Sequence, residues 1–293
     1  MRPAKIHVVI TDFDGWEQTQ QCLTKLLAST YSDLEIIVVD HGLSDETSIG
    51  MSEFPRCKRL PASSDLWWTG ATNVGIRHAL EQGASHIMLL NNDCFVEASA
   101  IETMLQYLPG PEQIIAPLQK NAATGEVGAG QTGTCFALGF ITLVTPSMRR
   151  RNSTARGLLQ TQMIIGGRGV IIPKTVFDKV GLFDEDALPH YGSDHDFYLR
   201  CVAAGIRLAI AADAVVAIDE SSTTVARNPG AMKVPEFLAS FSETRSHRNL
   251  AVQKTMFRRH YPIKSLYLIG VFLSVSRYTL IYAVTRIRSL LSA

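Results

Sequence analysis

An apolar run from Ile87 to Leu90 leads directly into Asn91, Asn92 and Asp93. Oxygen ligands just beyond a strand can share one face toward a hard divalent cation. In proteins, Mg²⁺ or Mn²⁺ takes one or two carboxylates together with substrate phosphate oxygens. In that interpretation Asp93 is the required carboxylate, and an asparagine adds a neutral oxygen or contacts a sugar. The alternative is a turn or a helix cap, in which the same residue types are common.

Two earlier apolar runs also end on polar residues. The run "IHVVI" ends on Thr11 and Asp12, and the run "LEIIVVD" ends on Asp40 before His41. Helical spacing in "EQTQQCLTKLLAST" and "NVGIRHALEQGA" separates these runs and predicts a β-α-β order with parallel strands. Ligands of open α/β sheets bind beyond the carboxyl ends of parallel strands. We therefore expect the three polar clusters to converge at one edge of a sheet.

The second half of the chain continues with elements of both kinds. The segment "GGRGVIIPKTVFDKV" predicts a strand and a helix, and "YGSDHDFYLRCVAAGI" predicts a helix that starts near Ser193 or Asp194. The segment "NAATGEVGAGQTGT" is typical of a loop or a short antiparallel strand, and "SMRRRNSTARG" of a flexible, basic surface excursion.

The composition excludes several functional classes. A chain of 293 residues with 46% hydrophobic content can bury a large core, so we expect one domain or one domain with an appendage. Its 28 basic and 27 acidic residues nearly cancel, which argues against a nucleic-acid partner. Five cysteines lie far apart without a C-x-x-C pair, and this favours reduced thiols over a zinc or disulfide framework. The N-terminal apolar run is too short for a signal peptide, so we expect a catalytic face in the cytoplasm.

The tail differs in composition from the rest of the chain. From about residue 263 it is almost long and apolar enough to span a bilayer, but Arg277 lies in its middle and basic residues flank both ends. We expect contact with the membrane, preferably as an interfacial or re-entrant helix, and the alternative is an amphipathic helix packed on the domain or on a partner. The predicted division is a domain of residues 1–250 and a membrane-associating segment of residues 251–293.

Six segments, in this order, resemble those of family 2 glycosyltransferases: "VVITDFD", "EIIVVDHGLSDET", "WWTGATNVGIRHAL", "IMLLNNDCFV", "GLFDE" and "YGSDHDFYLRCVAAGI". The resemblance covers about residues 5–220, and "LWWTGATNVGI" with "NND" looks most similar to bacterial rhamnosyltransferase-type members. It implies the GT-A fold, which is an α/β fold with a mostly parallel central sheet and helices on both faces.

The resemblance implies a binding site for a nucleotide-diphosphate sugar, with either a dTDP- or a UDP-sugar as donor. Asp40 would bind the base or the ribose, and Asp93 would hold Mg²⁺ or Mn²⁺, with His247 as a further metal ligand. The other donor-binding residues that it implies are Thr11, Phe13, Asn73, Asn91, Asn92 and Arg248.

The resemblance also implies the catalytic base. In "YGSDHD", Asp194 stands where the family places a base carboxylate, and Ser193 replaces the acid that usually precedes it. A carboxylate at a helix N-terminus stays ionised there, although the helix dipole lowers its basicity. On the acceptor side the resemblance points to Arg168, His190 and Asp196.

The predicted function is an inverting glycosyltransferase of the hexosyltransferase type in cell-surface polysaccharide synthesis. Its acceptor would be a glycan or a lipid-linked saccharide, and it would act at the inner face of the cell membrane, peripheral or anchored. A nucleotidyltransferase is less favoured, because "TDFDGWEQT" lacks a Gly-rich phosphate loop. A catalytically inactive nucleotide-sugar-binding protein of the same fold is the third interpretation, since a fold never proves turnover.

Overall fold

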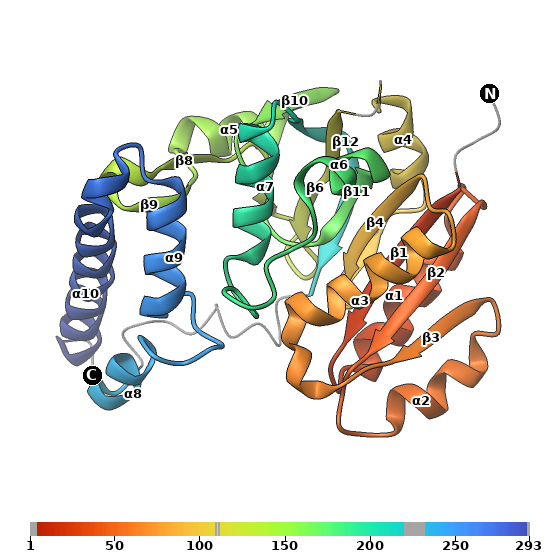
Figure 1. Cartoon of the computed structure of the whole chain (residues 1–293), viewed down its shortest axis with the longest axis horizontal. Helices are drawn as coiled ribbons and strands as arrows, with labels where there is room; N and C mark the ends of the chain where they lie inside the picture. The colour runs from red at the N-terminus through yellow and green to blue at the C-terminus, as the bar shows by residue number, and fades with distance from the viewer. Residues whose placement is uncertain (1–4, 109, 111, 220–231, 292–293) are drawn as a thin grey trace.

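A computed structural model of the chain describes residues 5–108, 110, 112–219 and 232–291 (Figure 1). Its described strands form a ten-stranded sheet with the main order β10-β12-β6-β11-β4-β1-β2-β3, and a separate pair, β8 and β9. The α/β class predicted from the sequence is confirmed. The strands are β1 (Ile6–Asp12), β2 (Leu34–Asp40), β3 (Cys57–Pro61), β4 (His86–Asn91), β5 (Cys94–Val96), β6 (Gln113–Asn121), β7 (Val127–Ala129), β8 (Gly133–Cys135), β9 (Phe140–Leu143), β10 (Leu158–Thr161), β11 (Arg168–Pro173) and β12 (Arg207–Ile218).

The N-terminal half of the sheet is parallel. Strand β1 lies between β2 and β4, and β3 pairs with the outer edge of β2. The register places Thr11 beside Asn91 and Asp12 beside Asp40. The polar ends of these strands therefore meet at one edge, as their sequence pattern predicts.

The other half of the sheet is mixed, which departs from the mostly parallel sheet that we expected. Strand β11 runs antiparallel to both β4 and β6. Strand β12 is parallel to β6 but antiparallel to β10 and β5. An apolar run predicts a strand but not its direction, because direction depends on the connections and on pairing with distant segments.

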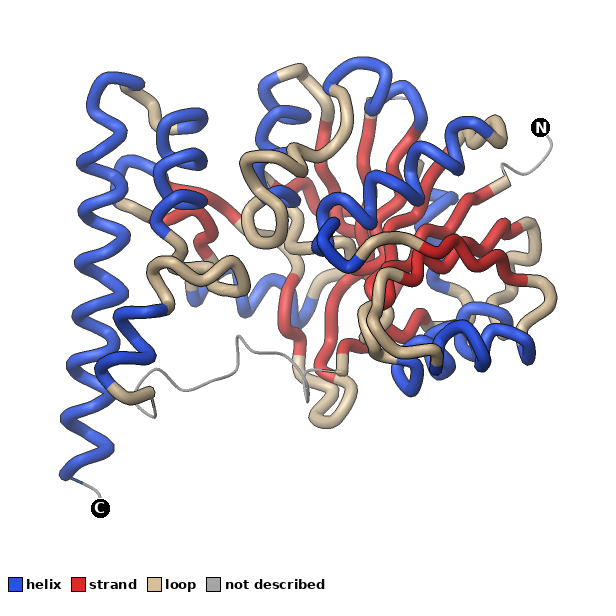
Figure 2. The backbone as a smooth tube through the Cα atoms, turned by 60° about the horizontal axis from the view of Figure 1, so that its bottom comes forward, coloured by secondary structure: helices blue, strands red, loops and turns tan. Residues whose placement is uncertain are grey.

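Helices cover both faces of the sheet (Figure 2). Apolar residues of α3, α6 and α7 share one buried cluster with the sheet, and those of α1 and α4 share a second cluster on the opposite face. The ten α-helices within the described residues are α1 (Trp16–Leu27), α2 (Glu46–Gly50), α3 (Trp67–Glu81), α4 (Ala100–Gln106), α5 (Pro146–Thr154), α6 (Lys174–Val180), α7 (Ser193–Ala203), α8 (Val234–Ala239), α9 (Leu250–His260) and α10 (Tyr267–Leu291).

The basic segment around residue 150 is a helix, so the expectation of a flexible excursion is wrong. Helix α5 starts after Thr145, whose hydroxyl accepts a hydrogen bond of 3.2 Å from the Met148 N–H. Pro146 occupies the first turn, where its missing N–H costs nothing. The cap and the proline at N1 are a helix-start signal that the run of arginines obscured.

The C-terminal helices pack together at one end of the molecule (Figure 1). A third buried cluster joins α9 and α10 to the short 3₁₀ helix η3 (Phe136–Leu138) and to Leu188 before α7. Helix α8 belongs to the same group, since Phe237 stacks on Tyr282 of α10 with ring centroids 4.1 Å apart. The predicted boundary at residue 250 falls at the start of α9, whereas the packing of α8 on α10 begins earlier in the chain.

Gly75 allows α3 to lie close to the sheet. A Cβ at this position would lie 2.3 Å from Cγ1 of Val9 and 3.0 Å from Cγ2 of Val39. We predict that Gly75→Val lowers the free energy of unfolding by about 1–3 kcal/mol, because a well-packed core has no room for added atoms. Urea unfolding followed by circular dichroism measures the change. Gly128→Val is the matched control, since its Cβ meets only a carbonyl oxygen at 3.8 Å. Equal stability of both variants would contradict the prediction.

Candidate functional site

A cavity of about 350 Å³ opens beyond the carboxyl ends of the parallel strands. Residues that follow β1, β2, β3 and β4 line it, together with the start of α3 and two residues from later loops. The lining residues are Thr11, Phe13, His41, Ser64, Trp67, Trp68, Asn91, Asn92, Asp93, His190 and Arg245. The cavity thus brings together the predicted residues Thr11, Phe13, Asn91, Asn92, Asp93 and His190.

A buried carboxylate fixes this edge of the sheet. Asp12 is completely buried and accepts hydrogen bonds from the hydroxyls of Thr19, at 2.6 Å, and of Thr47. It also accepts a 2.9 Å hydrogen bond from the side-chain amide of Asn92, which donates in addition to the Gly15 carbonyl at 3.3 Å. Asn92 therefore has a fixed orientation at the cavity wall, because its NH₂ group is directed into the protein.

Asn91, the first residue of the triplet, also belongs to the cavity wall. The side-chain oxygen of Asn91 accepts a 3.1 Å hydrogen bond from the indole N–H of Trp68. Trp67, the residue before Trp68, has a backbone φ of 53°, which is a strained value for a bulky residue. This backbone conformation begins α3 at the cavity, so both indoles belong to its wall.

Asp93 is a mostly buried carboxylate with weak protein partners. Burial raises its pKa, while a hydrogen bond from the Cys94 thiol and the charge of Arg168 partly offset that effect. The thiol sulfur lies 3.2 Å from Asp93, and the Arg168 guanidinium donates to Gln119 at 3.1 Å. A buried anion that lacks a close ion pair is stabilised by a cation, so Asp93 fits a divalent ion shared with substrate oxygens.

His247, the other predicted metal ligand, packs elsewhere. Its ring contacts Tyr191 and Tyr278, with centroids 6.3 and 5.4 Å apart, and it does not line the cavity. Burial lowers its pKa to about 4. Within the part of the chain that the structure describes, no three His, Cys, Asp or Glu side chains form a metal-binding group. Of the two predicted metal ligands, Asp93 therefore lies in the cavity wall and His247 does not.

Two buried imidazoles in the cavity wall have unsatisfied nitrogens. Within the described ranges of the chain, the Nδ1 atoms of His41 and His190 have no hydrogen-bond partner. Burial and the positive charge of Arg245 lower the pKa of His190 to about 4, so its ring is neutral near pH 7. Burial likewise lowers the pKa of His41. Buried polar atoms that lack partners are costly, and a ligand with hydroxyl or amide groups would satisfy them.

Arg245 is, like Ser64, a cavity residue that the sequence did not single out. Its guanidinium lies 5.1 Å from the ring centroid of Phe13 and 5.5 Å from that of Trp67. Among the described residues no carboxylate forms an ion pair with it. Held by aromatic faces alone, this cation remains available to an anionic ligand. No local pattern in "ETRSHRN" distinguishes Arg245 from the arginine three residues later.

Arg248, the arginine that we expected at the donor, lies outside the cavity lining. Its guanidinium donates to the Ser240 hydroxyl at 2.8 Å and lies 5.9 Å from the ring centroid of Phe237. Burial lowers its pKa. These contacts assign it to the packing of α8 against the loop that carries Arg245.

Asp40 and Asn73 also make protein contacts instead of lining the cavity. The Asp40 carboxylate is nearly buried and pairs with Arg59 at 2.7 Å, while the adjacent His41 reaches the cavity. The Asn73 amide donates to the Phe183 carbonyl at 2.9 Å and accepts from the Phe183 N–H at 3.2 Å. Asn73 therefore attaches α3 to the loop before α7.

Asp194 occupies the start of α7 with both oxygens engaged. One oxygen accepts a 2.9 Å hydrogen bond from the Gly166 N–H, and the other lies 2.8 Å from Nδ1 of His195. Nε2 of His195 in turn lies 2.8 Å from the hydroxyl oxygen of Thr142. Burial would raise the pKa of Asp194, but the attraction and hydrogen bonds of His195, with the Gly166 N–H, lower it to about 2. Its charge acts on His190, so it lies near the cavity wall without being among the lining residues.

Ser193 and Asp196, which lie close to Asp194 in the sequence, have structural roles. Ser193 is fully buried, and its hydroxyl accepts a 2.8 Å hydrogen bond from Thr69 of α3. Asp196, expected on the acceptor side, is also fully buried and pairs with Arg200, Arg259 and His260. Burial would raise the pKa of Asp196, but these three partners lower it to about 2. A carboxylate enclosed in this way cannot reach an acceptor.

We predict that Asn73→Ala lowers the free energy of unfolding by about 1–3 kcal/mol, because the buried N–H and carbonyl of Phe183 lose their partner. Urea unfolding measures the change. Arg77→Ala is the control, since Arg77 is exposed on the same helix and its guanidinium lies 3.4 Å from Glu185. A similar stability for Asn73→Ala and the control would mean that the Phe183 contacts contribute little.

The solved structures that resemble this chain share its fold. A mannosyltransferase from Pyrobaculum calidifontis, in complex with GDP-Man and Mn²⁺, aligns with a TM-score of 0.62 at 13% identity over 99% of this chain and 76% of that one. GalNAc-T7, solved with UDP, GalNAc and Mn²⁺, gives 0.61 at 15% identity over 89% and 58%. Staphylococcus aureus TarS 1-349, in complex with UDP-GlcNAc, gives 0.54 at 10% identity over 94% and 72%. The predicted GT-A-like fold is confirmed.

Curated relatives are uncharacterized proteins of Mycobacterium tuberculosis and Mycobacterium bovis, each 26% identical over 184 residues. The match covers 60% of this chain and 62% of each relative's length. The sequence profile of Glycosyl transferase family 2 matches residues 7–180, which include all four strands of the parallel half of the sheet. The chain therefore belongs to glycosyl transferase family 2.

Proposed function

We propose that this chain is an inverting glycosyltransferase that moves a sugar from a nucleotide-diphosphate donor to a hydroxyl group of a glycan or a lipid-linked saccharide. One observation carries the proposal: the cavity presents a buried carboxylate, Asp93, and an arginine, Arg245, that has no ion pair among the described residues. A diphosphate that shares a divalent cation complements both charges. Membership of family 2 supports transfer chemistry as the use of such a complex.

The finer assignments follow the motif resemblance. We propose a dTDP- or UDP-sugar as donor, with rhamnose as the candidate sugar, and cell-surface polysaccharide synthesis as the process. Thr11, Phe13 and His41 surround the part of the cavity beyond β1 and β2, and Trp67 and Trp68 offer stacking surfaces for a base or a sugar. The unsatisfied nitrogen of His190 suits a sugar hydroxyl.

Asp93 would hold Mg²⁺ or Mn²⁺ together with the phosphate oxygens of the donor. A bound divalent ion neutralises the diphosphate and assists its departure as a Lewis acid. His247 would have to leave its packing between Tyr191 and Tyr278 to take part, so we assign this role to Asp93 alone. We expected Arg168 on the acceptor side; because its charge acts on Asp93, we propose that it would lie near the metal.

Asp194 would act as the base that removes the proton from the acceptor hydroxyl. Its orientation is fixed by the Gly166 N–H and by His195, and the low pKa keeps it ionised near pH 7. The same low pKa makes it a weak base, so proton transfer would follow rather than precede attack on the anomeric carbon. Attack from the face opposite the diphosphate would invert the configuration.

A nucleotide-sugar-binding protein without turnover is the second candidate. Two features at the start of α7 favour it. A buried serine, Ser193, stands where the family usually has an acid, and Asp194 is ion-paired with His195. Both features reduce basicity at the position where a base is needed. Binding without transfer is therefore the result that would favour this candidate.

We predict sugar transfer from one member of a panel of UDP- and dTDP-sugars, measured as nucleoside diphosphate release with a membrane lipid extract of known activity as acceptor. Release should require Mg²⁺ or Mn²⁺. Asp194→Asn should lower kcat by about 10²–10⁴-fold while donor binding is retained, because the amide cannot accept the proton. Asp93→Ala should lose metal-dependent donor binding. Donor binding without release from any sugar would refute turnover and support the binding protein.

A pair of arginine variants tests the diphosphate site. We predict that Arg245→Ala raises the Kd of the metal-bound nucleoside diphosphate about 10- to 100-fold, since hydrogen bonds to charged groups contribute about 1.5–3 kcal/mol. Isothermal titration calorimetry measures the Kd. Arg248→Ala is the matched control from the same loop and should leave the Kd within about twofold, although it lowers stability. The reverse ranking would restore Arg248 as the donor residue.

A further inference from the structure

Helix α10 has one apolar face that no other described part of the protein covers. Its outer side carries large apolar side chains that are between 39% and 83% exposed: Leu268, Ile269, Phe272, Leu280, Val284, Ile287 and Leu291. Between them lie the small residues Ser276, Thr279 and Ala283, which are also exposed. At 100° per residue these positions fall on one side of the helix. We call these ten residues the outer face of α10.

The opposite side of α10 is fixed to the protein at successive turns. Gly270 lies against Phe257 and Tyr261 so closely that a Cβ would come within 2.5 Å of either ring. The Ser274 hydroxyl donates to the Gln253 side chain at 3.1 Å, in a buried position. Further along α10, the Tyr282 hydroxyl donates to the Met232 carbonyl at 3.2 Å.

Arg277, which makes a membrane span costly, has its partners within the protein. Its guanidinium donates to the Gly139 carbonyl at 2.6 Å and lies 4.1 Å from the ring centroid of Phe140. The helix is long and apolar enough to cross a bilayer, since an 18-residue window within Lys264–Ser289 has a mean hydropathy of 1.5. A helix that crossed the bilayer would break these contacts, because the polar domain attached to its inner side cannot enter the hydrocarbon.

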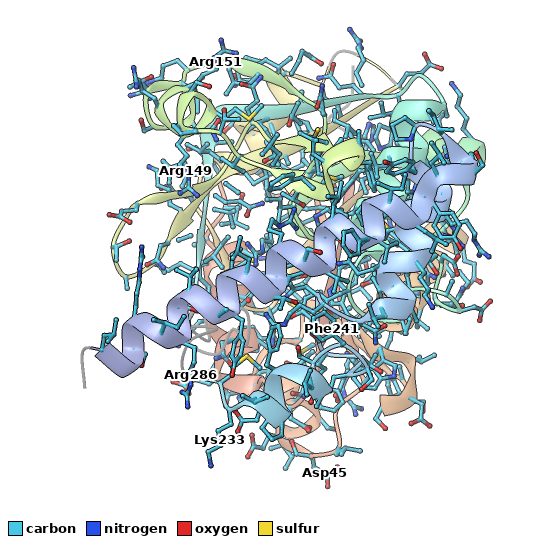
Figure 3. All side chains as sticks on the ribbon, turned by 90° about the vertical axis from the view of Figure 1, so that its left-hand side faces the viewer. Asp45, Arg149, Arg151, Lys233, Phe241 and Arg286 are labelled. Carbon is cyan, nitrogen blue, oxygen red and sulfur yellow. The ribbon has the colours of Figure 1, made fainter. Side chains whose placement is uncertain are left out.

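Basic residues lie on both sides of α10. After Glu243 the sequence contains nine lysines and arginines and no acidic residue. Three exposed arginines of α5 add to this charge: Arg149, Arg150 and Arg151. In Figure 3, which faces α10, Arg149 and Arg151 lie to one side of the helix and Arg286 and Lys233 to the other. An apolar ridge between cations complements an anionic lipid surface.

We propose that α10 lies parallel to the membrane, with its outer face in the headgroup layer of an anionic bilayer and its inner face on the domain. A second copy of this chain is a poorer partner, because an isologous interface would bring the basic residues of both copies together. The proposal deepens the proposed function, in which the acceptor can be a lipid-linked saccharide, and rests on it for its biological purpose. Vesicle binding without donor or acceptor tests it separately from catalysis.

The first experiment is co-sedimentation of the full chain with vesicles of phosphatidylcholine, with and without phosphatidylglycerol. We expect binding that needs phosphatidylglycerol, weakens with salt, and falls at least about tenfold in F272S/L280S. Leu43→Ser with Ile49→Ser is the matched control, since these side chains are 78% and 69% exposed and lie outside α10. Equal loss in both double variants would overturn the assignment to α10.

A second set of variants separates charge from apolar contact. Reversal of the three α5 arginines to glutamate should weaken binding to the anionic vesicles, whereas Lys25→Glu, Arg56→Glu and Lys58→Glu together should not. These control residues are exposed on α1, before β3 and within β3. Equal losses in the two triple variants would show that only net charge matters and would overturn the oriented contact.

Spin-label depth distinguishes a helix that lies flat from one that spans. Labels at Leu268→Cys, Leu280→Cys and Ile287→Cys, with Cys57 and Cys135 replaced by serine, should all report the same shallow depth, because the three positions share the outer face. A depth that passes through the bilayer centre along the series would show a spanning helix. A lipid-free dimer that F272S/L280S dissociates, together with no vesicle binding, would replace the membrane by a second copy. Either of these two outcomes overturns the proposal.

Discussion

The buried carboxylate of Asp12 is the constraint on which the candidate site depends. It joins the end of β1 to α1 through Thr19, to α2 through Thr47, and to the turn after β4 through Asn92. A buried charge is tolerated only when such hydrogen bonds surround it, so the four segments are fixed relative to one another. Asp93 follows Asn92 directly. The position of Asp93 in the cavity wall is therefore set by Asp12, which does not itself line the cavity.

Arg245, the positively charged residue of the cavity wall, comes from the C-terminal part of the chain. The parallel strands supply a carboxylate and amides, whereas Arg245 lies between α8 and α9. Packing holds this segment in place: Phe237 stacks on Tyr282 of α10, and Arg248 lies over Phe237. His247 adds a ring contact with Tyr278 of α10. The helix that we propose at the membrane therefore supports the loop that completes the wall of the cavity.

Local sequence patterns predicted the elements that carry the site. The polar ends of β1, β2 and β4 converge as expected, and α7 begins at Ser193 as its spacing indicated. The start of α5 was missed because the arginine run outweighed the cap at Thr145. Asp40, Asn73 and Arg248 were assigned to the donor site from their motif positions. In the structure their side chains instead contact Arg59, Phe183 and Ser240, respectively. A motif places a residue in the chain and leaves its partners unspecified.

The sequence by itself determined β1, β2 and β4, the helices α1 and α3, and the polar residues that end these strands, because periodicity and capping are local. Only the tertiary structure decided the direction of β11, the burial of Asp196 and the choice between Arg245 and Arg248. These outcomes depend on contacts between residues far apart in the chain, as with Asn73 and Phe183, which are 110 positions apart. Which partner a side chain meets over such a distance follows from the packing of the whole domain, and no local pattern encodes it.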